Sequence, residues 1–434
     1  MKTIRNLFAA ILAASLSAAS AQEAAPEDAV GNEAAVEERS VADVVNDYLA
    51  SKGYTEGENR NGDKVFYVAV GYGVIQAPLD SRSYADSRVN AFSKAMLDAK
   101  SKMAEYLEIS IRTSVEHDYA EGSIGGNEEA ESDPMSLSAK FRRLAAARID
   151  EALRAEGIDP DEAGREARER VAKRQLNGDF FRKAVHTAAR ARIVGMQVMC
   201  SFEGVPAGGK GQIAVVAVWS PKLQSMALSI SQGTELPTGV GKRPISEQIP
   251  TDRTVLLSTF GVQQKVDENG RLVLVAFGQA GAVSDSPTSA NAARNKAKMQ
   301  AAAAIREFAG ETVVVATDAV NAESVEEFEN AADAYEDVSA YSQRIRAVAE
   351  EMRISGIASI RSWEARHPLT GRMIYGTVCT WSPEAAAHAQ SMKRTMDSAA
   401  IPGASAPVGR APAPAANPNG TMMNRGSDAD DDAF

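Results

Sequence analysis

The stretch IAVVAVWSP, residues 213–221, returns near the other end of the chain as YGTVCTWSP, residues 375–383. The first run is apolar at almost every position, as is typical of a strand that is covered on both faces. Proline has no N–H to give to a sheet, and it fits the first turn of a helix. The shared Trp-Ser-Pro ending therefore indicates that in each copy a buried strand stops and a helix starts. The sequence contains an internal repeat.

Both copies of the repeat open with a strand that follows a turn signal. KVFYVAVGYG (residues 64–73) matches RLVLVAFGQA (271–280), and each follows a turn signal, Asn61-Gly62 in the first copy and DENG (267–270) in the second. In the second copy, STFGVQQKV (258–266) supplies a preceding strand. The matching part of the first copy, residues 48–59, is too polar to decide whether it forms one.

An alanine-rich helix follows in each copy, since its apolar residues recur at spacings of three and four. After the helix we expect a short strand, EISIRTSV (108–115) in the first copy and ETVVVATDAV (311–320) in the second. More helix leads to a closing hairpin, which begins with GMQVMCSFEG (195–204) and GIASIRSWEA (356–365). The prediction is an α+β fold with two related copies, each a small antiparallel sheet packed against helices.

The spacing of matched residues locates what differs between the copies. Gly71 and Gly278 lie 207 residues apart, whereas Trp219 and Trp381 lie 162 apart, so the first copy has a net 45 extra residues. They fall before the closing hairpin and predict a helical insertion at about 123–176.

The insertion has the features of a helical hairpin. Its GIDPDE break offers Gly157 to end one helix, and Asp159 with Pro160 to cap and start the next. Its mixed charges fit a solvated surface, and partner binding is the alternative.

The start of the chain predicts export. Lys2 and Arg5 precede a short apolar run, and Ala19-Ser20-Ala21 is a cleavage site of small residues, so we expect a signal peptide that is cleaved after Ala21. No cysteine follows for lipid anchoring, and no later run is apolar enough to cross a membrane. The predicted organisation is a signal peptide at 1–21, a disordered acidic segment at 22–38, the first repeat domain at 39–230, a linker at 231–250, the second repeat domain at 251–398, and a disordered Pro/Ala-rich acidic tail at 399–434.

Composition excludes some partners. The net charge is −11 and the basic residues are scattered, so we do not expect nucleic-acid binding. Cys200 and Cys379 occupy different positions in the two copies. Two free thiols are therefore favoured over a disulfide.

The chain has no complete sequence motif for catalysis, a cofactor or a metal. GVGKRP (239–244) lacks the first Gly and the final Ser or Thr of a phosphate loop, and AGGKG (207–211) falls in a hairpin turn. The four histidines have no metal-ligand spacing. The best candidate is His117-Asp118 beside Glu116, which a solvated strand end explains better. We assign no catalytic, cofactor-binding or metal residue.

The second copy resembles a known family. SGIASIRSWEARHPLTGRMIYGTVCTW resembles the pattern of bacterial twenty-kilodalton outer-membrane lipoproteins, and of the N-terminal domain of the flagellar outer-ring assembly T protein, through Gly356, Trp363, Pro368, Gly371 and Tyr375. The likeness covers roughly 60–230 and 255–385. It implies a sheet backed by helices and a role in cell-envelope assembly without catalysis. The chain departs from the family in its insertion and in lacking the lipid-attachment cysteine.

The sequence therefore favours a periplasmic or secreted, non-enzymatic cell-envelope protein that acts as an assembly or scaffold unit. Its expected partners are envelope proteins of unknown identity or a second copy of the chain. The alternative is a secreted hydrolase with a carboxylate site between the two repeats.

Overall fold

The computed structural model describes residues 40–122, 137–205, 209–232, 240–321, 338–352 and 354–399. The expected signal peptide, acidic segment and tail beyond Ala399 lie outside these residues, as does the start of the insertion. All the described residues fall within one compact unit.

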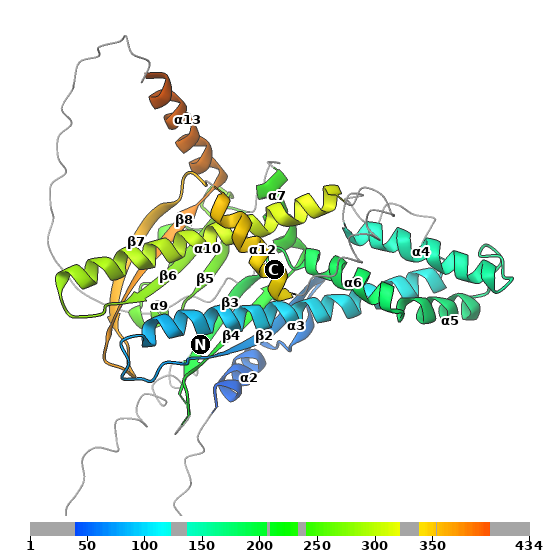
Figure 1. Cartoon of the computed structure of the whole chain (residues 1–434), viewed down its shortest axis with the longest axis horizontal. Coiled ribbons are helices and arrows are strands. Elements are labelled where there is room, and N and C mark those ends of the chain that lie inside the picture. Colours follow the sequence, from blue (N-terminus) through cyan, green and yellow to red (C-terminus); the bar gives the residue numbers. More distant parts are fainter. Residues whose placement is uncertain are drawn as a thin grey trace, which may run out of the picture. The chain divides into compact units, whose positions relative to one another are not determined.

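The predicted α+β fold with two related copies is confirmed (Figure 1). The first repeat contains α2 (Val41–Lys52), β1 (Gly57–Asn61), β2 (Lys64–Val74), α3 (Tyr84–Ala120), α4 (Leu137–Ala155), α5 (Arg165–Leu176), α6 (Asp179–Arg192), β3 (Gln197–Gly204), β4 (Gln212–Trp219) and α7 (Pro221–Gln232). The second contains α8 (Ile245–Gln248), α9 (Arg253–Leu257), β5 (Gly261–Val266), β6 (Leu272–Gly281), α10 (Pro287–Asn321), α12 (Val338–Glu351), β7 (Ala358–Arg366), β8 (Met373–Trp381) and α13 (Pro383–Ala399).

Each repeat builds an antiparallel four-stranded sheet with the same strand order, β1-β2-β4-β3 in the first (sheet A) and β5-β6-β8-β7 in the second (sheet B). The registers match as well: Trp219 lies opposite Tyr67, and Trp381 lies opposite Leu274. Even the register shift in the third strand recurs, at Met199 in β3 and at Ile360 in β7. The undecided stretch 48–59 holds the end of α2 and the start of β1.

A close helix–strand contact explains the matched glycines. Gly71 on β2 lies against the main chain of α3 at Ala95, and Gly278 on β6 lies against α10 at Ala297. A Cβ atom at either glycine would overlap a carbonyl oxygen of the helix. The alanine-rich helices and the glycines thus allow backbone to pack on backbone.

Both faces of each sheet are covered, as the apolar run in β4 predicts. In sheet A, α3 packs on one face and α2 covers the other. In sheet B, α10 covers one face and the segment with α8 and α9 packs on the other. The largest hydrophobic cluster contains residues of both repeats, among them Trp219 and Trp381. The expected linker, 231–250, includes α8, whose Gln248 is buried.

The strands expected at 108–115 and 311–320 were wrong. Both stretches continue the preceding helix, since α3 runs to Ala120 and α10 runs to Asn321. In α3, Ile111 and Val115 are buried one helical turn apart, in the cluster to which α4 and α6 also contribute. Tertiary packing overrides the β-branched composition here.

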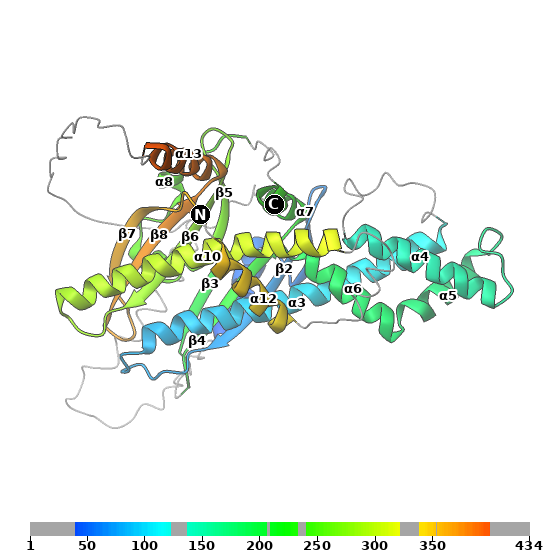
Figure 2. The ribbon, with the colours of Figure 1, turned by 45° about the horizontal axis from the view of Figure 1, so that its top comes forward.

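The insertion is a helical hairpin, but its second helix begins later than expected. Gly157 has a φ of 76°, as a helix-ending glycine requires. Asp159 and Pro160, however, lie in a separate turn, in which the Asp159 side chain accepts a hydrogen bond from the Asp161 N–H at 3.0 Å. The next helix starts at Arg165. Both helices lie beside the C-terminal half of α3 (Figure 2).

Candidate functional site

The boundary between the repeats holds a buried polar group that we call the boundary cluster: Tyr84, Arg88, Glu203, Gln279 and His367. Tyr84 and Arg88 come from α3 and Glu203 from β3, whereas Gln279 on β6 and His367 after β7 belong to the second repeat. The Arg88 side chain is 1% exposed and that of Glu203 is 10% exposed. The cluster is therefore the best-defined candidate site in the described part of the chain.

Glu203 is the centre of this cluster. Arg88 donates from Nε and Nη2 to Oε2 of Glu203, at 2.8 and 2.5 Å. The other oxygen, Oε1, accepts from the Tyr84 hydroxyl at 3.0 Å and lies 3.1 Å from His367 Nε2. Both carboxylate oxygens thus have hydrogen-bond partners, which come from the first repeat (Tyr84 and Arg88) and from the second (His367).

Arg88 also ties the first repeat to the backbone of the second. Its Nη1 donates to Gln279 Oε1 at 3.2 Å, and its Nη2 donates to the Leu257 carbonyl at 3.0 Å. Gln279 in turn donates to three carbonyls at the end of α9 and just after it, those of Leu256, Leu257 and Thr259. The guanidinium further lies over the Phe260 ring, 5.3 Å from its centroid.

The electrostatics of the cluster favour a charged Glu203. Burial alone would raise the pKa of this carboxyl, but the positive charge of Arg88 and the hydrogen bonds from His367 and Arg88 outweigh it and lower the pKa to about 2. Burial, followed by the neighbouring charge of Glu203, raises the pKa of Tyr84 well above its ordinary value. At neutral pH the cluster therefore contains a carboxylate and a neutral phenol.

Two further ion pairs cross the boundary between α3 and α10. Lys100 Nζ lies 2.9 Å from Glu311 Oε1, which is largely buried, and Lys296 Nζ lies 2.7 Å from the more exposed Asp86 Oδ1. Each of these carboxylates is paired with a cation of the opposite repeat, Glu311 with Lys100 and Asp86 with Lys296. The boundary carboxylates are thus paired separately rather than gathered at one point.

The seam between the two sheets is also polar. The Gln264 N–H of β5 donates to Gln197 Oε1 of β3 at 2.8 Å, and Gln264 Nε2 donates to the Gly195 carbonyl at 3.0 Å. Further along β3, the Ser201 hydroxyl donates to the Ser258 carbonyl. The two edge strands therefore run antiparallel, joined by side chains.

The residues singled out from the sequence do not meet at the boundary. Glu116, His117 and Asp118 lie on α3 rather than at a strand end, so the expectation of a strand end was wrong. Asp118 pairs with Arg142 of α4 at 3.2 Å, while His117 is exposed. In the described residues, no group of three or more His, Cys, Asp or Glu is arranged to hold a metal ion.

The glycine-containing loops and the two cysteines noted in the sequence do not form a binding site in the described residues. In the loop at 240–244, Gly241 packs against the main chain at Glu268. Residues 207 and 208 lie outside the described part of the chain. Cys200 and Cys379 are both free thiols, the first partly exposed and the second buried.

Sequence reasoning missed the boundary cluster. Glu203 and Glu364 occupy the same place in the two closing hairpins, and each pairs with an arginine of its own long helix, Arg88 and Arg294. These arginines occupy different positions of their helices, so the repeat alignment could not reveal them. His367 lay within the family-like motif but carried no signal of its contact.

Comparisons with known proteins give no function. A domain family of unknown function, DUF6844, matches residues 135–232. A crystal structure of a hypothetical protein from Francisella tularensis is similar, with 17% identity and a TM-score of 0.48, and covers 80% of this chain and 93% of that chain. No curated protein matches the sequence. In the described residues, none of the helices has the length and apolarity needed to cross a bilayer.

Proposed function

We propose that this protein is an exported, non-enzymatic cell-envelope protein whose two repeats form one assembly or scaffold unit. The observation that carries the proposal is the boundary cluster. Arg88, Glu203 and Gln279 fix one repeat to the other through buried, mutually satisfied polar groups. Such an arrangement keeps the two sheets in one fixed relative orientation, as a scaffold requires.

The export half of the proposal rests on the sequence. The charged, apolar and small-residue segments before Gln22 have the order of a secretory signal peptide. The resemblance of the second repeat to envelope lipoproteins points to the same compartment. Envelope proteins, or further copies of the chain, are the proposed partners.

A secreted hydrolase is the alternative, and the Glu203–His367 contact is the observation that favours it. A histidine next to a carboxylate can serve as a general base when its other ring nitrogen faces the substrate. Here Nδ1 of His367 is buried and has no hydrogen-bond partner among the described residues. His367 as a whole is 2% exposed, so a substrate has no direct route to it. The geometry therefore supports a fixed boundary better than a reaction centre.

Two measurements test the proposal. In a bacterial host, the full chain should appear in the periplasmic fraction and a chain without residues 2–21 should not. After cross-linking in cells, the chain extracted from the envelope should elute as a larger species than the purified protein. A chain that stays in the cytoplasm, or that elutes as the purified protein does after cross-linking, would contradict the proposal.

The hydrolase alternative has its own matched variants. Glu203→Gln removes the boundary carboxylate, whereas Glu364→Gln removes its exposed counterpart in the second repeat. If purified protein cleaves ester, peptide or glycan substrates and only Glu203→Gln abolishes the cleavage while remaining folded, the alternative is correct.

A further inference from the structure

The β3/β5 seam shows how the repeats cover one sheet edge. In sheet A the edge strand β3 does not face solvent, because β5 of the second repeat lies along it. Three side chains make the contact, those of Gln197, Ser201 and Gln264. Val198 of β3, which lies beside Gly261 of β5, is only 4% exposed.

Strand β7 is the counterpart of β3, and it keeps two of the three groups that β3 and its start offer to the seam, because only Gln197 is replaced, by Ala358. Gly356, like Gly195, has a positive φ and packs on the first turn of the helix that follows the hairpin. Ser362 lies opposite Thr377 of β8, as Ser201 lies opposite Val215 of β4, so the two serines correspond. The Gly195 carbonyl and the Ser201 hydroxyl, which form hydrogen bonds with the segment of β5 in the first repeat, thus have counterparts in the second.

Unlike β3, β7 has no strand of the described residues along its outer edge. In the described residues, β7 is the outermost strand of sheet B and no strand pairs with its outer side (Figure 2). Ser359, which corresponds to the buried Val198, is exposed, and so are Ile360 and Ser362. Open edge strands are the usual place where an extended segment of another chain adds to a sheet.

We propose that the outer edge of β7 binds an extended segment of a partner protein, in the manner in which β5 lies along β3. The segment runs antiparallel to β7 and carries a glutamine or asparagine whose amide donates to the Gly356 carbonyl. This inference rests on the proposed scaffold function and names its docking surface and partner class.

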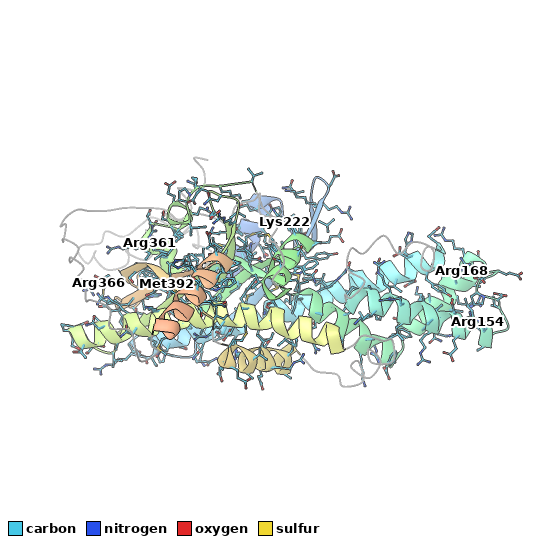
Figure 3. The ribbon with its side chains drawn as sticks, turned by 90° about the horizontal axis from the view of Figure 1, so that it is seen from above. Arg154, Arg168, Lys222, Arg361, Arg366 and Met392 are labelled. Carbon is cyan, nitrogen blue, oxygen red and sulfur yellow. The ribbon has the colours of Figure 1, made fainter. Side chains whose placement is uncertain are left out.

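The charges at this edge limit what the segment carries. Arg361 and Arg366 lie on β7 (Figure 3), while Glu364 is paired with Arg294 at 2.8 Å. The Arg361 guanidinium donates hydrogen bonds to three main-chain carbonyls in and just after α8, those of Ser246, Ile249 and Pro250. The exposed Arg366 leaves the edge positive, so a neutral or acidic segment fits it better than a basic one.

A second copy of this chain fits the edge poorly. The strand that corresponds to β5 is β1, whose Glu58 lies opposite Tyr67 as Gln264 lies opposite Leu274. A carboxylate has no proton to donate, so Glu58 would face the Gly356 carbonyl with oxygen against oxygen. Repetition of the seam from one molecule to the next is therefore disfavoured, and the partner is a different protein.

A peptide copied from β5 of this chain can serve as a probe for the outer edge of β7. A labelled peptide with the β5 sequence STFGVQQKV (258–266), in which Lys265→Gln makes the side chains neutral as the edge favours, is titrated with the full chain and followed by fluorescence anisotropy. Saturable binding is expected, and a peptide with Gln264→Glu should bind at least about tenfold more weakly, since it loses a hydrogen bond and gains a repulsion.

Cross-linking locates the peptide. In a chain with Cys200→Ser and Cys379→Ala, Ser362→Cys should form a disulfide with a peptide that carries Ser258→Cys. The matched control, Arg60→Cys on the opposite, exposed edge of sheet A, should not.

Three results would overturn the inference: no saturable binding, equal cross-linking at Arg60→Cys and Ser362→Cys, or a concentration-dependent dimer of the full chain that Ser362→Cys links between copies. None of these results bears on whether the chain is exported or enters a larger envelope complex. Failure of the β7 surface is therefore distinguishable from failure of the scaffold function.

Discussion

Arg88 on α3 and Glu203 on β3 form a buried ion pair, with 2.5 Å between Nη2 and Oε2, at the point where the two repeats meet. The pair lies within the first repeat, yet Gln279 and His367 of the second repeat complete it. Two charges out of water are stable only when their remaining hydrogen-bonding groups are satisfied. The second repeat supplies those partners, so the pair couples the folding of the two repeats.

Glu203→Gln should destabilise the protein strongly. It leaves the Arg88 guanidinium buried without its counter-charge, and breaking a buried pair in this way typically costs about 3–5 kcal/mol of unfolding free energy. Urea unfolding at pH 7 measures the loss. Glu364→Gln is the matched control, because its pair with Arg294 is exposed and should be worth no more than about 1 kcal/mol. Equal losses for the two variants would contradict a special role of the boundary.

The stability of the protein should fall at acid pH through Glu203. Its pKa is about 2 in the folded state and 4.5 is the ordinary value, so between these values the unfolded chain binds the proton and the folded chain does not. The contribution is fully present above pH 4.5 and is lost as the pH falls toward 2. Unfolding free energies measured from pH 6 to pH 2 should decrease less steeply for Glu203→Gln than for the wild type. Parallel curves would show that Glu203 is not the responsible group.

Gly71→Ala and Gly278→Ala should each cost about 3 kcal/mol or more. The added methyl group would overlap the Ala95 or Ala297 carbonyl oxygen, and main chain cannot move aside as a side chain can. Thermal melts of the two variants measure the effect. Gly164→Ala is a suitable control, since that position has open space around it and an ordinary φ of −68°, and loses at most about 1 kcal/mol as a helix cap. If the control melts as low as the other two, the close approach is not the cause.

The repeat and both closing hairpins could be predicted because their signals are local. Turn residues, continuous apolar runs and the Trp-Ser-Pro endings mark these strands without reference to the rest of the chain. The ends of the long helices could not. Ile109 and Ile111 alternate as in a strand, yet only Ile111 is buried, because α4 and α6 pack against one face of α3. That face exists only after the insertion has folded.

The boundary cluster could not be predicted from the sequence for a different reason. Arg88 and Glu203 are separated by 115 residues, and Glu203 and His367 by 164. Nothing local distinguishes Arg88 from the many other arginines of the chain. The seam shows the same limit, because Gln264 meets Gly195 only through the packing of the two repeats.

The two matched tryptophans should stabilise the fold rather than bind a ligand. Trp219 is 3% exposed with its ring centroid 5.8 Å from that of Tyr67, and Trp381 is 8% exposed. Replacement of either by alanine should cost about 3–5 kcal/mol, through lost burial and the cavity that remains.

Phenylalanine substitutions separate packing from hydrogen bonding at these two positions. Trp381 Nε1 donates to the Ser355 carbonyl at 3.1 Å, whereas Trp219 Nε1 has no partner among the described residues. Trp381→Phe should therefore cost more than Trp219→Phe, by the roughly 1–3 kcal/mol of a carbonyl left unpaired. Urea unfolding of the four variants decides the matter. If both alanine variants unfold at the urea concentration of the wild type, the tryptophans are not core residues, and the Trp-Ser-Pro endings mark a binding surface instead.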